Sequence, residues 1–454
     1  MIDLKNKRVL IMGLGSFGGG ADSVRFACEQ GAEVTVTDLA EESKLRETIE
    51  TLGSLPVRWH LGGHSEEDFR RAEVVIVNPA VTAENPYLQL ARQAGAVITS
   101  QVELFFERCP ARIVAVTGSN GKSTTTALTA HLLAGGGDSA GRPYRRVYLS
   151  GNIGNRPLLG LLEDLRSEDI VVLEISSFQL EQLGPCRRGA DAAVLTNLSP
   201  NHLDRHSSFE TYCAAKEILF SNQKPNPAFP PVSIFNGEDT VGLRWFEKYS
   251  QEGFRRCVLF RAGDVEACYR EKFRLPGQVN LQNLAAALAV AKVFEVDREH
   301  LQKAVSTFEG LEHRMQLVSE KDGVRWYDDS KATTPISTMA ALNGIEEPKI
   351  LIAGGYDKHI SFDELGRCIA QRCKAVVLIG QTADKISEAI QSAGPSQVIV
   401  KRAKTMEEAV ICCSKMAQKG DIVLMSPACA SFDMFKNYQE RGKVFQKAVL
   451  NLCQ

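Results

Sequence analysis

The residues best suited to chemistry lie in the segment TGSNGKST, residues 117–124. It follows an expected buried strand at residues 112–116, and an expected helix opens at Lys122. Backbone N–H groups of a glycine-bearing turn, with a helix N-terminus behind them, form a socket for phosphate oxygens. Lys122 would reach the outer phosphates, and the hydroxyl of Ser123 or Thr124 would meet a magnesium ion. Only two residues separate the glycines, where the strict P-loop has four. The segment still predicts nucleotide-phosphate binding by Gly118, Ser119, Asn120, Gly121, Lys122, Ser123 and Thr124.

A carboxylate and several amides accompany this loop in the sequence. Glu174 ends an expected strand, at the edge where open α/β sheets place their ligands. It could merely offset the positive end of the next helix. We favour a magnesium role, because Mg²⁺ commonly takes carboxylates together with phosphate oxygens. The run SGNIGN, residues 150–155, places two amides among glycines and suits a polar ligand. Asn280 and Asn283 lie three apart on one side of an alanine-rich helix, where buried amides have a binding or capping task.

Two histidines and a lysine follow. His202 and His206 lie four apart, which on a helix would place both imidazoles on one face and suggests a zinc site. The metalloprotease pattern HExxH needs a glutamate where Leu203 stands, so we prefer one histidine beside the nucleotide metal. Lys216 lies in a helical run, and by itself it predicts a solvated side chain.

The first segment contains a second glycine-rich turn. An apolar strand runs into Gly13-x-Gly15-x-x-Gly18, and a further strand ends on Asp38, about 20 residues later, where a Rossmann fold holds a ribose hydroxyl. Taken alone, this pattern predicts NAD binding and an oxidoreductase. A UDP-sugar also carries a pyrophosphate, however, and the motif does not choose between the two ligands.

In the last segment the pattern of an apolar strand, a turn of small residues and a helix restarts near residue 312. Charged and hydroxyl residues gather at the expected strand ends. Because the carboxyl ends of parallel strands share one edge of a sheet, this edge would close on an anionic ligand. The residues of this edge are Arg314, Asp329, Lys331, Thr333, Lys358 and Ser431.

Composition sets the limits of these hypotheses. The chain has 454 residues, of which 44% are hydrophobic and 24% charged, with a net charge of -2. This balance gives no general attraction to nucleic acid. The twelve cysteines lack CxxC spacing, which indicates reduced thiols and a cytoplasmic protein, and no membrane-spanning run is expected. We predict an α/β fold of three domains: a Rossmann-like domain at 1–109, a P-loop ATPase-like domain at 110–312 and a Rossmann-like parallel α/β domain at 313–454.

The combination of motifs resembles the Mur ligases of peptidoglycan synthesis. The resemblance covers essentially the whole chain and rests on motifs in the family's order: TGSNGKST, SGNIGN, LEISSFQL, NLSPNHLDRH, Asn280-x-x-Asn283, Glu312-His313-Arg314, DDSKATTP and SPACASFDMFKNY. The SSFQL, HLDRH and SPACASFDMF segments are similar to the D-glutamate-adding members. The triple Gly18-Gly19-Gly20 departs from the family's usual turn.

This resemblance implies an ATP-dependent ligase that joins D-glutamate to UDP-N-acetylmuramoyl-L-alanine through an acyl phosphate, and it moves the first turn from NAD to UDP. It implies two Mg²⁺ ions on Ser123, Glu174 and His202, with a carbamylated Lys216. It names Lys122, Glu174, His202 and Lys216 as catalytic, and Asn283, Arg314 and Asp329 as further ATP contacts. The implied substrate contacts are Ser16, Phe17, Asp38, Asn152, His202, Lys331, Thr333, Lys358, Ser431 and Tyr438.

We therefore expect a cytoplasmic, monomeric enzyme without a nucleic-acid partner. An NAD-dependent oxidoreductase and a non-catalytic nucleotide sensor are the alternatives. The oxidoreductase would leave the central phosphate loop idle, and the sensor would use that loop without turnover.

Overall fold

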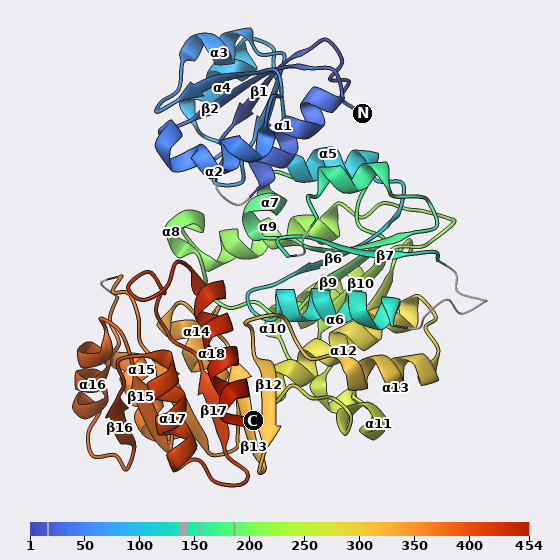
Figure 1. The fold of residues 1–454 in the computed structure, drawn as a ribbon. Helices are drawn as coiled ribbons and strands as arrows, with labels where there is room; N and C mark the ends of the chain where they lie inside the picture. The colour runs from blue at the N-terminus through green and yellow to red at the C-terminus, as the bar shows by residue number, and fades with distance from the viewer. Residues whose placement is uncertain (16–17, 136–143, 154–155, 185–187, 359, 454) are drawn as a thin grey trace. The chain divides into compact units, whose positions relative to one another are not determined.

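The computed structural model describes the chain except residues 16–17, 136–143, 154–155, 185–187, 359 and 454, together with the side chains of 203, 204 and 453. The described chain divides into two compact units. Unit 1 consists of Met1–Asp264 and Asn283–Leu301, and unit 2 of Val265–Gln282 and Gln302–Gln454. Unit 1 holds two β-sheets and unit 2 holds one (Figure 1). The predicted three-domain α/β class is confirmed, whereas the boundaries at 109 and 312 stay predictions.

The first sheet is fully parallel, with strand order β3-β2-β1-β4-β5. Its middle strands are continuous apolar runs, as a sheet covered by helices on both faces requires. Its strands are β1 (Arg8–Met12), β2 (Glu33–Asp38), β3 (Val57–Leu61), β4 (Val74–Val77) and β5 (Val97–Ser100). Its helices are α1 (Gly19–Glu29), α2 (Glu42–Leu52), α3 (Glu66–Arg71), α4 (Pro86–Gln93) and α5 (Gln101–Arg108).

The second sheet is also parallel, with order β11-β10-β9-β6-β8-β7. Because β6 lies between β9 and β8, the strand order reverses at β6, and ligands of open α/β sheets bind at such a switch point. Its strands are β6 (Arg112–Thr117), β7 (Val147–Gly151), β8 (Ile170–Glu174), β9 (Ala192–Leu195), β10 (Val232–Asn236) and β11 (Arg256–Phe260).

The helical segments around this sheet range from 3 to 13 residues in length. They are α6 (Lys122–Ala134), η1 (Leu159–Glu163), α7 (Ser177–Glu181), α8 (Leu203–His206), α9 (Phe209–Ser221), α10 (Thr240–Tyr249) and η2 (Ala262–Asp264). Helix α7 begins with the predicted capping box, since Ser176 Oγ accepts from the Gln179 N–H and the Gln179 side chain returns to the Ser176 N–H. Helices α12 (Gln278–Val293) and α13 (Arg298–Thr307) each run across a boundary between the units.

The sheet of unit 2 has the order β12-β13-β17-β14-β15-β16. It is parallel except at one edge, where β12 pairs with β13 in antiparallel fashion. Asp322 and Gly323 join these two strands with φ of 55° and 75°, as a type I′ hairpin turn requires. The sequence predicts a parallel sheet here, and the structure adds one antiparallel strand, β12, at its edge. The strands are β12 (Gln316–Lys321), β13 (Val324–Asp328), β14 (Lys349–Ala353), β15 (Ala375–Leu378), β16 (Ile399–Arg402) and β17 (Ile422–Met425).

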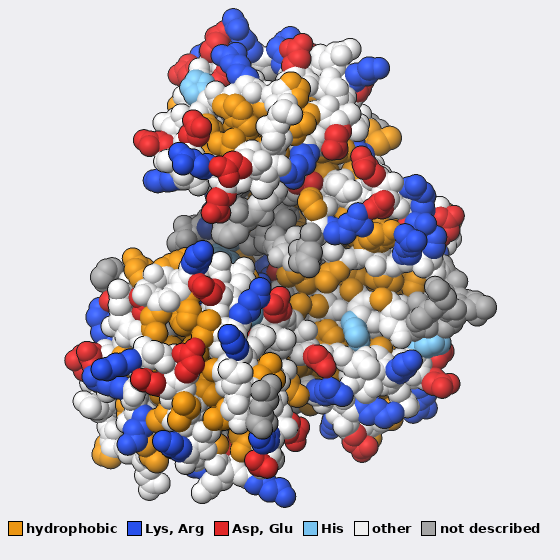
Figure 2. All heavy atoms as spheres, in the orientation of Figure 1, with side chains coloured by type: hydrophobic (Ala, Val, Ile, Leu, Met, Phe, Trp, Pro, Cys, Tyr) orange, Lys and Arg blue, Asp and Glu red, His pale blue; other side chains and the backbone are white. Residues whose placement is uncertain are grey.

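The helices of unit 2 are α11 (Ala267–Arg270), α14 (Pro335–Gly344), α15 (Asp363–Arg372), α16 (Ala383–Ser392), α17 (Met406–Met416) and α18 (Tyr438–Cys453). Basic and acidic side chains are mixed on the visible surface, as the net charge of -2 predicts (Figure 2). Among the residues that the structure describes, no helix combines the length and apolarity needed to cross a membrane.

Candidate nucleotide and metal site

The phosphate loop connects β6 to α6, and the segment after β9 holds its backbone in place. The N–H of Ser119 donates to the Asn197 carbonyl (2.8 Å), and the N–H of Asn120 donates to Asn197 Oδ1 (3.1 Å). Thr196 Oγ1 donates to the Asn120 carbonyl (2.6 Å). Lys122 Nζ donates to the Ser119 carbonyl (2.9 Å), which keeps the ammonium group at the loop. The turn is thus organised by the structure around it before any ligand binds.

Both glycines of the loop are required by their surroundings. Gly118 has a φ of 145°, and a Cβ atom there would lie 2.0 Å from Thr196 Oγ1. Gly121 is the N-cap of α6 with a φ of 80°, and its Cβ would lie 2.3 Å from Asn283 Oδ1. Thr125 Oγ1 donates to the same Asn283 oxygen (3.1 Å). Asn283 therefore lies against the phosphate loop, where the sequence predicts an ATP contact.

Glu174 and Lys216 are buried close to this loop. Glu174 is paired with Val116 across the sheet and is 6% exposed, and its Oε2 is buried without a hydrogen-bond partner. Lys216 is 1% exposed, with Nζ 3.4 Å from Thr117 Oγ1. Burial and the nearby charge of Lys122 lower the pKa of the Lys216 ammonium well below its usual value. The expectation of a solvated Lys216 is therefore wrong, because its helix turns this residue into the interior.

The orphaned Glu174 oxygen fits a magnesium ion. Within the described ranges, no three His, Cys, Asp or Glu side chains lie close enough together to hold a metal unaided. An ion at Glu174 would complete its shell with phosphate oxygens, water and the Ser123 hydroxyl, the ligands that Mg²⁺ prefers. Ser123 and Thr124 are both buried in the first turn of α6. Asn152 follows β7 and donates its N–H to the Glu174 carbonyl (3.1 Å), so it lies beside the same strand end.

His202 and His206 do not share the helical face that a zinc site would need. His202 precedes α8 with a φ of 53° and is exposed, and its ring meets Phe178 edge-on at 5.1 Å. His206 is buried, stacks on the same Phe178 ring at 5.4 Å, and its Nε2 is hydrogen-bonded to Ser177 Oγ at 2.9 Å. His202 is thus exposed and His206 buried, and the expectation of one histidine beside the nucleotide metal stays a prediction.

In the first sheet, Asp38 organises the glycine-rich turn. Its Oδ2 accepts from the N–H groups of Leu14 (2.8 Å) and Gly15 (3.2 Å). The predicted uridine contacts Ser16 and Phe17 lie outside the described residues. A Cβ at Gly20 would lie 2.1 Å from the Leu14 carbonyl oxygen, so the last glycine of the unusual triplet is needed for close packing of α1 on the turn.

In unit 2, most of the residues predicted at this edge follow the carboxyl ends of β13, β14 and β17. Arg314 instead precedes β12, whose first residue Gln316 pairs with Asp328 at the end of β13. Asp329 is buried, with Oδ2 accepting from Ser426 Oγ (2.7 Å) and Oδ1 from the Met315 N–H (3.3 Å). Burial raises the pKa of Asp329 to about 7, and the Ser426 hydrogen bond and the charge of Arg314 oppose this shift. Asp329 is thus a carboxyl group that can titrate near neutral pH.

The amino-acid-binding candidates of unit 2 differ in exposure. Ser431 is buried, Lys358 is exposed, and Thr333 is half-buried. Lys331 donates its N–H to the His313 carbonyl (2.9 Å), and its Nζ lies 6.0 Å from the centre of the Tyr438 ring.

Sequence reasoning missed Arg441, which joins two of these loops. It is 1% exposed, and its guanidinium donates to Ser330 Oγ (2.9 Å), the Ser330 carbonyl (2.8 Å) and the Cys429 carbonyl (3.0 Å). Burial lowers the pKa of Arg441 to about 10. Ser330 lies between Asp329 and Lys331, so Arg441 fixes the predicted substrate residues. A lone arginine on a terminal helix carries no sequence signal for this contact.

Comparison with known proteins identifies the family. The Mur ligase MurD-like N-terminal domain profile matches residues 7–100, the Mur ligase middle domain 116–272 and the Mur ligase glutamate ligase domain 313–429. The chain belongs to the Mur ligase family. A member from Roseiflexus sp. (strain RS-1), named UDP-N-acetylmuramoylalanine–D-glutamate ligase, is 41% identical and is matched over 99% of both chains. A member of the same name from Acetivibrio thermocellus is 38% identical over 98% of this chain and 97% of that protein.

A solved Mur ligase structure supports the fold. MurF ligase from Thermotoga maritima, solved in complex with ADP, has a TM-score of 0.54 and 18% identity, covering 99% of this chain and 96% of that one. Since the first segment matches a Mur ligase N-terminal profile, the oxidoreductase alternative finds no support, and the glycine-rich turn is that of a ligase.

Proposed function

We propose that this Mur ligase joins D-glutamate to UDP-N-acetylmuramoyl-L-alanine by an amide bond, converting ATP to ADP and phosphate during peptidoglycan precursor synthesis. The observation that carries this proposal is the 41% identity, over 99% of both chains, to a relative named for that reaction. The organised phosphate loop and the orphaned Glu174 carboxylate supply what such a reaction needs.

The chemistry explains why a phosphoryl group must be transferred first. A carboxylate is a poor electrophile, since its leaving group would be oxide. One oxygen of the alanyl carboxylate attacks the γ-phosphorus of ATP, the bond to the β-phosphate breaks, and ADP leaves with the electron pair. The ammonium group of D-glutamate first loses one proton to solvent, and the resulting amine attacks the acyl carbon. The C–O bond to phosphate then breaks, and the nitrogen loses a second proton to solvent, so that the amide keeps one N–H. The products are an amide, ADP and phosphate.

Lys122 and the loop amides would hold the β- and γ-phosphates. Phosphoryl transfer depends mostly on positioning and on neutralising charge, and Lys122 supplies a positive charge that its bond to the Ser119 carbonyl already keeps at the loop. Gly118, Ser119, Asn120, Gly121 and Thr124 would surround the phosphates, with Asn283, Arg314 and Asp329 as the other ATP contacts.

Two magnesium ions would be held by Ser123, Glu174 and His202, and by a carbamate on Lys216. The ions, when bound, offset the charge of the transferring phosphoryl group. Carbamate formation requires a neutral amine, and the burial of Lys216 beside Lys122 favours that form. The carbamate would turn a cationic side chain into an oxygen ligand. The ligase activity of the enzyme should therefore depend on bicarbonate. Small carboxylates should restore activity to the Lys216→Ala variant.

The substrate contacts complete the proposal. UDP would be bound by the turn with Ser16, Phe17 and Asp38, and the muramoyl-alanine arm by Asn152 and His202. D-glutamate would be bound by Lys331, Thr333, Lys358, Ser431 and Tyr438. We also propose that the enzyme acts in the cytoplasm as a monomer, which sedimentation at working concentration would test.

The function is tested by ADP release from the purified chain. The UDP-muramoyl-alanine substrate and ATP are mixed with a panel of amino acids, and only D-glutamate should give stoichiometric ADP and a new amide by mass spectrometry. Release without the amino acid, or release with meso-diaminopimelate in place of D-glutamate, would refute the assignment.

A further inference from the structure

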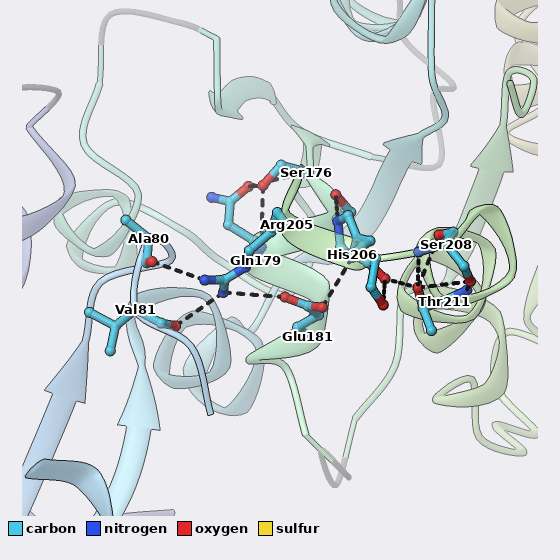
Figure 3. Close-up of polar contacts among 11 residues, drawn as sticks. Ala80, Val81, Ser176, Gln179, Glu181, Arg205, His206, Ser208 and Thr211 are labelled. Atoms are coloured by element: carbon cyan, nitrogen blue, oxygen red, sulfur yellow. Dashed lines mark hydrogen bonds and ion pairs between the residues drawn. The ribbon is translucent and has the colours of Figure 1, made fainter. Parts of the chain in front are cut away.

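Two residues located after strands of the central sheet donate side-chain hydrogen bonds to one loop of the first sheet. The guanidinium of Arg205, in α8, donates to the carbonyls of Ala80 (3.1 Å) and Val81 (3.2 Å) (Figure 3). The amide of Gln182, just after α7, donates to the carbonyl of Asn78 (2.8 Å). We call Arg205 and Gln182, with the three carbonyls they bind, the carbonyl clamp. Main-chain carbonyls of one loop thus meet donors from two different elements.

The donors of the clamp are fixed on their own side. The Arg205 side chain is only 18% exposed and pairs with Glu181 at 3.5 Å. Figure 3 draws this ion pair between the two labelled residues. Its guanidinium also lies 5.5 Å from the centre of the Phe178 ring. The Arg205 N–H donates to the His202 carbonyl (3.0 Å). Because α8 starts directly after His202, the backbone of Arg205 is hydrogen-bonded to this predicted metal and substrate residue.

The acceptors of the clamp are fixed to the glycine-rich turn. The Asn78 amide donates to the Gly13 carbonyl (3.3 Å), and the Asn78 N–H donates to the Met12 carbonyl (2.9 Å). A Cβ at Gly13 would lie 2.8 Å from the Asn78 Cβ, so the two residues are in close contact. The loop bound by the clamp is thus packed on the turn proposed to recognise UDP.

Away from the clamp, the elements of the two sheets also meet where Asp22 accepts from the N–H groups of Leu159 (2.7 Å) and Gly160 (3.2 Å), and they share one hydrophobic core cluster. A cavity of about 990 Å³ borders the clamp and is lined by Val81, Gln182 and Arg205, among others. Beside this space, the hydrogen bonds of the clamp tie the loop directly to the segments that follow Glu174 and His202.

We propose that Arg205, assisted by Gln182, is a positioning residue that couples UDP recognition to placement of the reacting carboxylate. Binding energy from a remote part of a substrate accelerates a reaction only if it is transmitted to the reacting centre, and displacements of about 1 Å can cost about 100-fold in rate. The clamp provides this rigid connection. The proposal rests on the proposed ligase function and deepens it. It states how binding of the uridine diphosphate half of the substrate helps to position the alanyl carboxylate that reacts.

The test compares two substrates in wild-type enzyme and in Arg205→Ala. One is UDP-N-acetylmuramoyl-L-alanine, and the other lacks the uridylyl group and ends at the muramoyl phosphate. With the full substrate, the variant should lose at least about 30-fold in kcat/KM. With the truncated substrate it should lose less than about 3-fold, while the KM for ATP stays unchanged. Added ethylguanidinium should restore part of the loss with the full substrate only.

Arg92→Ala is the matched control. Arg92 lines the same cavity, but it donates to the carbonyl of Ala83 in its own sheet's domain (3.0 Å), so the two substrates should respond to its loss equally and weakly. Equal losses of Arg205→Ala on both substrates, or no loss on either, would overturn the proposal. If Arg205→Ala does not fold, Gln182→Met is carried through the same comparison. If the wild-type enzyme turns over neither substrate, the proposed function fails instead.

Discussion

The structure requires glycine at position 121, and the loss of stability caused by replacing it follows from the local geometry. Gly121→Ala places an L-residue at a φ of 80° and a Cβ atom 2.3 Å from Asn283 Oδ1. The left-handed backbone costs about 1–2 kcal/mol. Asn283 must also move and release its hydrogen bond from Thr125 Oγ1, which is worth about 1 kcal/mol. We expect a total cost of about 2–3 kcal/mol at the first turn of α6.

Gly18→Ala is a matched control for this variant. Gly18 is also a helix N-cap with a left-handed backbone, at a φ of 85°, but nothing lies within 4 Å of a Cβ built there. It should show the backbone cost alone, about 1–2 kcal/mol. The difference between the two variants isolates the collision with Asn283.

Native-state hydrogen exchange measures both costs locally, in the peptides that contain α6 and α1, so the result does not depend on two-state unfolding of a multidomain chain. Affinity for a non-hydrolysable ATP analogue should fall for Gly121→Ala and stay near wild type for Gly18→Ala. Equal destabilisation by the two variants, with equal analogue affinity, would show that Asn283 does not hold the loop as described.

Three further predictions follow from buried groups. The folded-state pKa of Asp329 is raised to about 7, so its ionisation lowers the free energy of unfolding as the pH rises from 3.8 toward that value. The loss reaches about 4 kcal/mol. Asp329→Asn should therefore raise the thermal midpoint more at pH 8 than at pH 5. Arg441→Met leaves two buried carbonyls without their donor and should lower the stability of unit 2 by about 2–4 kcal/mol in urea unfolding. Gly20→Ala should lower stability by about 1–3 kcal/mol and raise the KM for the UDP substrate, because its Cβ would lie 2.1 Å from a main-chain oxygen.

Much of the fold could be predicted because parallel strands covered on both faces leave continuous apolar runs in the sequence. The phosphate loop and the position of Glu174 at a strand end follow from those runs. The hairpin of β12 and β13 also had a signal, Asp322-Gly323, the dipeptide that favours a type I′ turn. The alternation of strands and helices predicted for this segment leaves no place for a hairpin.

For Lys216 the sequence contained a signal of burial, but the charge of a lysine side chain favoured the prediction of a solvated residue. Tyr212, Ala215 and Leu219 are buried on α9, and a lysine at position 216 falls within this i, i+3, i+4, i+7 stripe. A charged side chain on the apolar face of a helix is a stronger hint of function than its identity alone conveys.

The carbonyl clamp, by contrast, could not be predicted. Arg205 and Gln182 bind main-chain carbonyls that lie 104 to 125 residues away along the chain. Any residue type offers such an acceptor, so the sequence of the loop contains no trace of the contact.

The path of the chain through the two units has a practical consequence. The chain passes between them at 264/265, 282/283 and 301/302, so neither unit is one continuous stretch of sequence. A recombinant fragment that stops at residue 264 would lack Asn283 and all of α12, and its phosphate loop would lose the partner of Thr125. Dissecting this enzyme therefore calls for a cut beyond Thr307, the last residue of α13, or for two fragments supplied together and tested for reassembly.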